Sequence, residues 1–261
     1  MLELSIVLPT CDRAAMLEKC LAAIEAGVRC SHEIIVVDGA STDQTQDVLA
    51  DTLKKLGADR LRVIREPRRE GFVKATNKGF RAARGKNMIW LNDDARPLPG
   101  AFDQAIQQLD SESGDVAFVA LFHRWSASKN IAFETEFRGT TYRLCHVRGT
   151  LYANFPMGRR ETYERLAYFD ERFYICGADP DLSLKAWYAG MSVVPAWHAI
   201  IDHDEFEDDR RAADSLRARE DNHRLFAKWD LPDRNVYRNN FDPNHPCTVR
   251  RLREIFIQEA A

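Results

Sequence analysis

Short, mostly apolar runs alternate with helical segments through roughly the first ninety residues, and this alternation limits the possible folds more than any other feature. Four runs are typical of buried strands: Leu4–Leu8, Ile34–Val37, Leu61–Ile64 and Met88–Leu91. The segments between them carry helical spacing or helix-start residues, over about 14–27, 41–56 and 71–83. Such strands, separated by helices, predict an α/β fold with an open, mostly parallel sheet and helices on both faces.

The second half of the chain is less regular. Val116–Ala120 and Ser192–Val194 are typical of strands, and Asp181–Ala189 and residues 205–228 are typical of helices. Residues 122–150 mix aromatic residues, Arg and Gly without a clear period. There is no internal repeat and no linker rich in Pro, Gly or Ser. The simplest organisation is one continuous domain with a C-terminal extension.

The charge balance excludes one class of protein. The 261 residues include 37 basic and 40 acidic side chains, for a net charge of −3, whereas non-specific nucleic-acid binders carry a basic excess. No run approaches the roughly 18 apolar residues of a membrane-spanning helix. The six cysteines are scattered without a Cys-x-x-Cys pair, as in a reducing compartment. We therefore expect a cytoplasmic protein with no nucleic-acid partner and no transmembrane segment.

Polar side chains follow two of the predicted strands. One cluster runs from Asp38 to Asp43, and the other is Asn92-Asp93-Asp94. Open α/β sheets bind ligands outside the carboxyl ends of their strands, so both clusters are expected to line one crevice. Taken alone, Asn92-Asp93-Asp94 fits either a turn or an oxygen-ligand site for Mg²⁺ or Mn²⁺.

Six motifs, in order between about residues 4 and 205, resemble those of family 2 glycosyltransferases. The first, Ser5-Ile6-Val7-Leu8-Pro9-Thr10, resembles the opening of the family, and Glu33 to Asp43 resembles its E-I-I-V-V-D segment. Asn92-Asp93-Asp94 stands where the family carries its D-x-D motif. The remaining three resemble its G-x-x-x-A-x-N-x-G, R-R-E…F-D-E and G-E-D-x-D-L motifs: Gly71–Gly79, Arg159–Glu171 and Gly177–Leu182. Six ordered motifs are far more specific than any one of them.

The resemblance implies a GT-A fold and an inverting, metal-dependent glycosyltransferase of the hexosyltransferase type. A Rossmann-like half that binds the nucleotide-sugar would occupy residues 1–95, and an acceptor-binding half residues 96–204. Together they would form a GT-A domain over residues 1–204, followed by a helical extension over 205–261. The donor would be a nucleotide-diphospho-sugar, with a UDP-sugar favoured, and the cofactor would be Mn²⁺ or Mg²⁺.

The resemblance also implies roles for individual residues. Asp38 would hydrogen-bond the base, Asn77 would support the pocket, Asn92 would touch the ribose and Asp94 would bind the metal. The other positions expected in the nucleotide-sugar site are Pro9, Thr10, Asp12, Arg13, Ser41, Gly71 and Asp93.

Asp179 matches the second acid of the family's E-D pair and is the expected general base, since a positioned carboxylate removing the acceptor's proton typically contributes ~10²–10⁴-fold. Asp181 is its rival. Pro180 favours an extended or turn conformation at Asp179 and a helix start after it, where Asp181 would interact with the helix dipole.

A histidine after the base often completes the metal site in this family. Ala199-Ile200-Ile201-Asp202-His203 resembles that segment, so His203 is the candidate ligand and His198 the alternative. Two residues depart from the family pattern. Asn92 replaces an acid, which leaves Asp94 to supply most of the charge that the metal needs. Ala178 replaces the Glu before the base, which removes a carboxylate that would help to orient the acceptor.

The expected acceptor is a saccharide or lipid-linked saccharide, in surface polysaccharide or glycolipid biosynthesis. Peripheral contact with the inner face of the membrane is compatible with the arginines at 250, 251 and 253. Two other functions remain open. A nucleotidyltransferase on a related fold would release pyrophosphate, whereas a glycosyltransferase releases a nucleoside diphosphate. A catalytically degenerate nucleotide-sugar-binding protein would release neither of these products.

Overall fold

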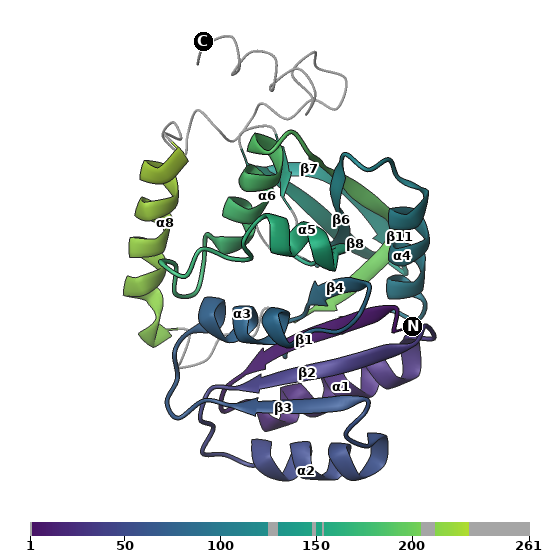
Figure 1. Ribbon diagram of the computed structural model, residues 1–261, viewed down its shortest axis with the longest axis vertical. Coiled ribbons are helices and arrows are strands. Elements are labelled where there is room, and N and C mark those ends of the chain that lie inside the picture. The colour runs from purple at the N-terminus through teal and green to yellow at the C-terminus, as the bar shows by residue number, and fades with distance from the viewer. Residues whose placement is uncertain (1, 125–129, 148–149, 153, 205–211, 230–261) are drawn as a thin grey trace.

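The computed structural model describes residues 2–124, 130–147, 150–152, 154–204 and 212–229. A single mixed sheet, flanked by helices, runs through the molecule (Figure 1). The elements of the first part are β1 (Leu4–Thr10), α1 (Ala14–Gly27), β2 (His32–Asp38), α2 (Thr45–Leu56), β3 (Leu61–Arg65), α3 (Phe72–Ala82) and β4 (Asn87–Trp90). All of the strands and helices expected up to residue 91 are therefore present, and their ends lie within a few residues of the predicted ones.

These first four strands are parallel, in the order β3-β2-β1-β4. β1 pairs along its whole length with β2, from Leu4 opposite His32 to Thr10 opposite Asp38. Its seven residues are all buried, as expected of a strand covered on both faces. The loops after β1, β2 and β4 therefore meet at one edge of the sheet.

The second part of the sheet is mixed. Its elements are β5 (Ala95–Pro97), α4 (Ala101–Ser111), β6 (Val116–His123), β7 (Ile131–Phe137), β8 (Thr140–Val147), β9 (Thr150–Tyr152), β10 (Pro156–Arg159), α5 (Arg160–Arg165), α6 (Ala178–Tyr188), β11 (Ser192–His203) and α8 (Ser215–Trp229). β10 lies between β4 and β6 and is antiparallel to both, whereas β11 is parallel to β6. Parallel pairing is thus found within β3-β2-β1-β4 and between β6 and β11, and the other strand pairs are antiparallel.

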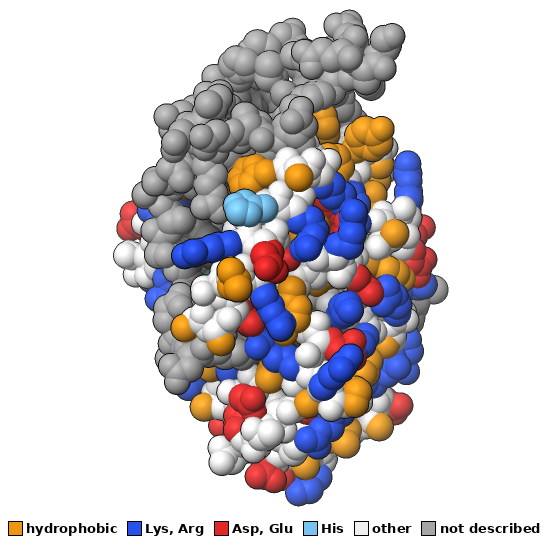
Figure 2. Space-filling view, turned by 90° about the vertical axis from the view of Figure 1, so that its left-hand side faces the viewer, with side chains coloured by type: hydrophobic (Ala, Val, Ile, Leu, Met, Phe, Trp, Pro, Cys, Tyr) orange, Lys and Arg blue, Asp and Glu red, His pale blue; other side chains and the backbone are white. Residues whose placement is uncertain are grey.

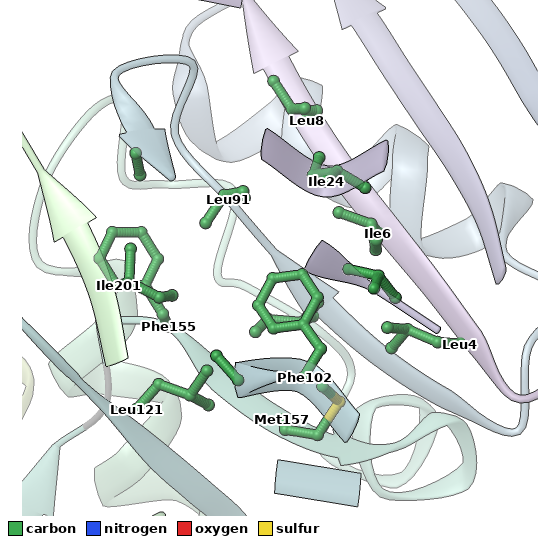
Figure 3. Packing of buried hydrophobic residues seen from close by; sticks show 14 of the residues in the cluster. Leu4, Ile6, Leu8, Ile24, Leu91, Phe102, Leu121, Phe155, Met157 and Ile201 are labelled. Atoms are coloured by element: carbon green, nitrogen blue, oxygen red, sulfur yellow. The ribbon is translucent and has the colours of Figure 1, made fainter. Parts of the chain in front are cut away.

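Two apolar clusters cover the two faces of the sheet. Leu4, Ile6 and Leu8 of β1 point to one face, where they pack with α1, α2 and α4 (Figure 3). Val7 points to the other face and packs with α3, α5, α6 and α8. Because side chains alternate along a strand, one apolar strand contributes to both clusters. Burying each large aliphatic side chain contributes about 1.5–3 kcal/mol to stability. Because apolar side chains point to both faces of the sheet, helices cover both faces.

Three features of the second half differ from the sequence-based expectation. Residues 131–147, for which no period was found, form the β7–β8 hairpin. β11 extends to His203 and contains a register shift between Ala196 and Ile200. α6 begins at Ala178, so Asp179 and Pro180 lie within its first turn; Pro180 is tolerated there because the first-turn amides have no partner within a helix. The arginines at 250, 251 and 253 lie outside the described residues.

Within the described residues, no helix is both long enough and apolar enough to cross a membrane. On the face that carries α8, acidic and basic side chains are interspersed (Figure 2).

Candidate nucleotide-sugar site

A cavity of about 290 Å³ lies at the carboxyl ends of β1 and β4, where the parallel strands end. The nine predicted site residues among its lining are Pro9, Thr10, Arg13, Gly71, Asn92, Asp93, Asp94, Asp179 and His203. The sheet order brings the residues after β1 close to those after β4, because these strands are neighbours: Leu4 pairs with Asn87 and Val7 with Trp90. The crevice expected at this edge of the sheet is therefore present.

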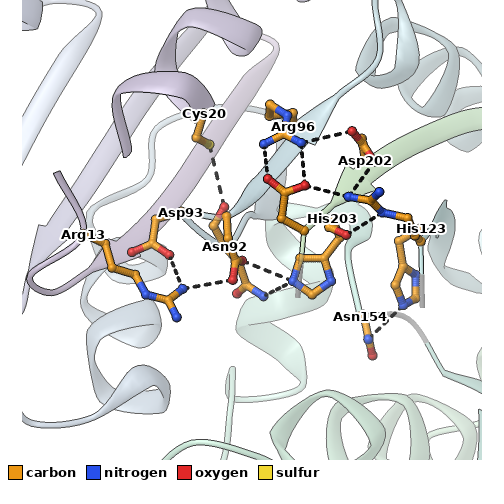
Figure 4. Close-up of polar contacts among 12 residues, drawn as sticks. Arg13, Cys20, Asn92, Asp93, Arg96, His123, Asn154, Asp202 and His203 are labelled. Atoms are coloured by element: carbon orange, nitrogen blue, oxygen red, sulfur yellow. Dashed lines mark hydrogen bonds and ion pairs between the residues drawn. The ribbon is translucent and has the colours of Figure 1, made fainter. Parts of the chain in front are cut away.

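Arg13 lies between the two carboxylates of the Asn92-Asp93-Asp94 segment (Figure 4). Its Nη1 atom is 3.1 Å from Oδ1 of Asp93 and 2.9 Å from Oδ2 of Asp94. The hydroxyl of Thr10 donates a further hydrogen bond to Oδ2 of Asp93, at 2.8 Å. All of these side chains are almost completely buried. Adjacent carboxylates repel each other unless a cation or hydrogen-bond donors offset their charge, and Arg13 and Thr10 do so here.

His203 reaches the same segment from the end of β11. Its Nε2 atom is 3.1 Å from Oδ1 of Asp94 and 3.4 Å from Nδ2 of Asn92 (Figure 4). His203 is buried and lines the cavity. His198, the alternative ligand, is exposed, has a φ of 68° and does not line the cavity. The geometry therefore pairs His203, and not His198, with Asp94.

A carboxylate and an imidazole fit a divalent ion. Neighbouring ligands of Mg²⁺, each about 2.1 Å from the ion, lie about 3 Å apart, which agrees with the 3.1 Å between Asp94 and His203. The described residues contain no cluster of three or more His, Cys, Asp or Glu side chains suited to a metal. One or two protein ligands are common for Mg²⁺ when substrate phosphates complete its coordination. The donor set thus suits an ion that binds together with a phosphate-bearing substrate.

Ion pairs hold the strand end that carries His203. Arg96, on β5, contacts Asp202 at 3.0 Å and Asp204 at 2.6 Å. Arg124 contacts Asp204 at 2.6 Å and donates to the backbone oxygen of His203 at 3.0 Å. Two arginines thus neutralise the acidic residues on either side of His203.

Asp179 enters the cavity from the first turn of α6. Within the described part of the chain, no other side chain donates a hydrogen bond to its carboxylate. Burial raises the pKa of Asp179 to about 7 and outweighs the opposing effect of its own backbone amide. A carboxylate with a pKa near neutrality is suited to accept a proton at physiological pH.

Asp181 points elsewhere. Its side chain is fully buried, and its Oδ1 atom lies 2.7 Å from Nζ of Lys228 and 2.7 Å from Nε1 of Trp229. It does not line the cavity. Of the two candidate bases, only Asp179 faces the site; Asp181 joins α6 to α8.

Four predicted residues do not line the cavity: Asp12, Asp38, Ser41 and Asn77. Asp38 is buried and accepts hydrogen bonds from the Ser41 amide, at 3.0 Å, and from Gln46, at 2.6 Å. Burial acts to raise the pKa of Asp12, but hydrogen bonds from Thr42 and Asp43 outweigh it and hold that pKa below its usual range. These side chains hold the loop that contributes Gly39 to the cavity.

Asn77 lies beside the cavity and links two segments of the chain. Its amide nitrogen donates to the backbone oxygen of Phe169 at 2.9 Å, and its oxygen accepts from the Phe169 amide at 3.0 Å. It thereby ties α3, which follows the cavity-lining Gly71, to the segment that leads towards α6.

Sequence reasoning missed several residues that line the cavity, including Glu66, Arg69, Asn154 and Cys176. Arg69 forms an ion pair with Asp214, and its guanidinium carbon lies 5.8 Å from the centre of the Tyr174 ring. The Asn154 amide nitrogen lies 3.0 Å from Nε2 of His123, a histidine whose pKa burial lowers to about 3. Arg69 lies two residues before the Gly71 motif, and this position was a signal in the sequence.

Comparisons with known proteins point to one enzyme family. The sequence model described as "Glycosyl transferase family 2" matches residues 5–178. A Mycobacterium bovis protein named "PGL/p-HBAD biosynthesis glycosyltransferase" is 27% identical over 204 residues, which are 76% of this chain and 74% of that protein. A Drosophila melanogaster dolichyl-phosphate beta-glucosyltransferase is 33% identical over 125 residues, 44% of this chain and 38% of its own.

Solved structures show the same fold. A mannosyltransferase from Pyrobaculum calidifontis, in complex with GDP-Man and Mn²⁺, has a TM-score of 0.68 and 20% identity, and the match covers 99% of this chain and 70% of that one. Staphylococcus aureus TarS, in complex with UDP-GlcNAc, has a TM-score of 0.63 and 18% identity, with coverage of 81% and 61%. With the family match over most of the chain, these likenesses confirm the GT-A fold and an enzyme that transfers a sugar from a nucleotide-sugar. The chain belongs to glycosyltransferase family 2.

Proposed function

We propose that this glycosyltransferase transfers a hexose with inversion, from a nucleotide-diphospho-sugar to a hydroxyl group, and that Asp179 is its general base. The observation that carries the proposal is that Asp179 and the Asp94–His203 pair line the same cavity. A base and a site for a charged leaving group are the two elements that direct displacement at the anomeric carbon requires.

Asp179 would accept the proton of the acceptor hydroxyl as the oxygen attacks. An alcohol is too weak an acid to attack unaided, and a base with a pKa of about 7 is largely ionised slightly above neutrality. Because inversion places the acceptor on the side of the sugar opposite the leaving diphosphate, one base suffices and no covalent intermediate is needed. Water drawn into the same position would lead to slow hydrolysis of the donor.

Asp94 and His203 would hold Mn²⁺ or Mg²⁺, which, when bound, stabilises the negative charge on the leaving nucleoside diphosphate. Asn92 adds a neutral amide next to His203, so Asp94 supplies most of the charge from the protein. Arg13 adds a positive charge that stays in place whether or not a cation is bound, because guanidinium does not deprotonate.

The nucleotide would lie against Pro9, Thr10, Arg13, Gly71, Asn92 and Asp93, with Asp12, Asp38, Ser41 and Asn77 acting indirectly by holding the loops around the cavity. We favour a UDP-sugar as the donor. Among proteins of the same fold, the mannosyltransferase is in complex with GDP-Man and TarS with UDP-GlcNAc, so the experiment below compares nucleotides with different nucleobases.

The acceptor would be a saccharide or lipid-linked saccharide in surface polysaccharide or glycolipid assembly. Names of relatives support this class: one belongs to PGL/p-HBAD biosynthesis, and a Campylobacter jejuni relative, 25% identical, is a GalNAc(5)-diNAcBac-PP-undecaprenol beta-1,3-glucosyltransferase. Residues 96–204 would bind this acceptor, at the cytoplasmic side of a membrane, and residues 1–95 the donor.

The decisive first experiment measures thermal stability with UDP, GDP, dTDP and CDP, each with and without Mn²⁺. A nucleotide at about 100 times its Kd adds about 2.7 kcal/mol, and we expect one nucleotide to do so only with metal. The matching donor is then incubated with the enzyme and with Asp179→Asn. Release of nucleoside diphosphate by the wild type alone supports the proposal. Release of pyrophosphate from a nucleoside triphosphate would favour a nucleotidyltransferase, and binding without either product a degenerate binding protein.

A further inference from the structure

Asp221 of α8 is bonded to the loop that precedes Asp179. Its Oδ2 atom accepts hydrogen bonds from three consecutive backbone amides, those of Tyr174 at 2.9 Å, Ile175 at 2.8 Å and Cys176 at 3.2 Å. The carboxylate is 1% exposed, so these bonds are shielded from water. Hydrogen bonds to an ionised acceptor are about twice as strong as neutral ones, and here one carboxylate fixes the backbone of a whole turn.

That loop forms part of the cavity wall and leads directly into α6. Ile175 and Cys176 line the cavity, and the Tyr174 oxygen accepts a hydrogen bond from the Val73 amide at 3.2 Å. Gly177, with a φ of 78°, follows the loop and is the N-cap of α6. Only one residue separates it from Asp179, so any displacement of the loop moves the Asp179 carboxylate.

The other end of α8 holds the chain on the far side of Asp179. Trp229 donates from Nε1 to Asp181 at 2.7 Å, and Lys228 forms ion pairs with Asp181 at 2.7 Å and Asp170 at 2.8 Å. α8 therefore contacts the chain both before and after the residue that faces the cavity. This helix lies beyond residues 5–178, which the family shares.

We infer that α8 positions the catalytic carboxylate of Asp179, with Asp221 and Trp229 as the positioning residues that fix the chain on its two sides. The inference rests on the proposed role of Asp179 as the base. Asp221 and Trp229 do not line the cavity, so they act on the reaction only through the segment they hold. A displacement of ~1 Å at a reacting group can cost ~10²-fold in rate, which makes this kind of support measurable.

Two substitutions distinguish a role in positioning Asp179 from a role in stabilising the fold. Asp221→Asn keeps the shape of the side chain but replaces one carboxylate oxygen by an amide donor and removes the charge. Trp229→Phe keeps an aromatic ring but removes the N–H that reaches Asp181. Leu225→Ala is the control: Leu225 is buried on the same helix, one turn after Asp221, and packs into the apolar cluster without bonding to the loop.

Each variant is assayed for donor hydrolysis with UDP-glucose, UDP-GlcNAc and GDP-mannose in the presence of Mn²⁺, and for nucleoside diphosphate binding and Tm. We expect Asp221→Asn to lower kcat at least about tenfold, with the nucleotide Kd changed by less than about threefold. Trp229→Phe should lower kcat about threefold or more. Leu225→Ala should lose stability but retain kcat near the wild-type value at a temperature where it is folded.

The inference is overturned if Asp221→Asn and Trp229→Phe keep kcat, or if they lose it only in proportion to Tm, as the control does. Asp179→Asn in the same assay tells the two proposals apart. If it abolishes hydrolysis while Asp221→Asn has no effect, Asp179 is the base but α8 does not position it. If Asp179→Asn remains fully active, the assignment of the base and the role of α8 both fail.

Discussion

Nε2 of His203 lies 3.1 Å from Oδ1 of Asp94, although the two residues are 109 positions apart in the chain. The sheet explains the contact. β11 is antiparallel to β5, with His203 directly opposite Ala95, the residue that follows Asp94. The backbone register therefore places the imidazole beside the carboxylate, as the proposed metal site requires.

Replacing His203 by Ala should remove the metal-dependent part of nucleotide binding, because Asp94 alone would then hold the ion. We expect the gain in Tm from UDP with Mn²⁺ to fall to the gain from UDP alone. His198→Ala is the matched control, since His198 is exposed and lies outside the cavity, and it should keep the full gain. The opposite pattern would assign the ligand to His198.

Asp179 should make the protein less stable as the pH rises. Its pKa is about 7 in the folded protein, above the ordinary value of 3.8, so between these values the folded state holds a proton that the unfolded state has lost. Stability therefore falls from about pH 4 to pH 7 and then levels off, by at most about 4 kcal/mol at 1.36 kcal/mol per pKa unit. Asp179→Asn lacks this ionisation, so its Tm relative to wild type should rise over the same pH range.

Asp181→Asn is the control for that pH series. It weakens the buried pair with Lys228, so we expect it to lower Tm near neutral pH, where Asp179→Asn raises it. Equal pH dependence of wild type and Asp179→Asn would show that Asp179 ionises with an ordinary pKa and would weaken its assignment as the base.

Arg69→Ala should weaken nucleotide binding by about 10- to 100-fold, since a hydrogen bond to a charged group is worth about 1.5–3 kcal/mol. Arg69 lines the cavity and is held there by Asp214 and Tyr174. Arg68→Ala removes the same charge from an exposed neighbour and should leave Kd within about threefold. Calorimetric titration with UDP or GDP and Mn²⁺ measures both. Equal effects would mean that Arg69 contributes only long-range charge.

Gly71→Ala should destabilise the protein and narrow the nucleotide site. Gly71 has a φ of 98°, and a Cβ there would lie 2.6 Å from the Tyr174 ring, closer than any real contact. Gly57→Ala isolates the backbone effect, because Gly57 has a φ of 79° and no atom within 4 Å of a Cβ. Both glycines have ψ near 160°, a region that is essentially restricted to glycine at positive φ, so we expect the control to cost about 1–3 kcal/mol and Gly71→Ala clearly more, in urea unfolding. Similar costs would mean that Tyr174 moves aside freely.

Much of the fold was readable in the sequence. Apolar runs such as Ile34–Val37 and the helical spacing between them specify local structure, and the order of six motifs identified the family, now confirmed by the match over residues 5–178. These signals are local, because a strand that is buried on both faces has a continuous apolar run of only a few residues. The sequence of the β7–β8 hairpin shows no such run. The seven residues of β7 are partly buried or exposed, and buried and exposed positions do not alternate regularly along the strand.

The tertiary structure decided how residues distant in sequence come together. Lys228 and Trp229 of α8 bind Asp181, whereas Asp179 faces the cavity. Asp38 was expected to bind the nucleobase, but in the structure its carboxylate accepts hydrogen bonds from Ser41 and Gln46 in the segment that follows it. By itself the sequence determined the strands and helices up to residue 91, their order and the family, since these follow from local patterning. Which side chains share the cavity was set by sheet register and helix packing, because those contacts join residues that no local pattern relates.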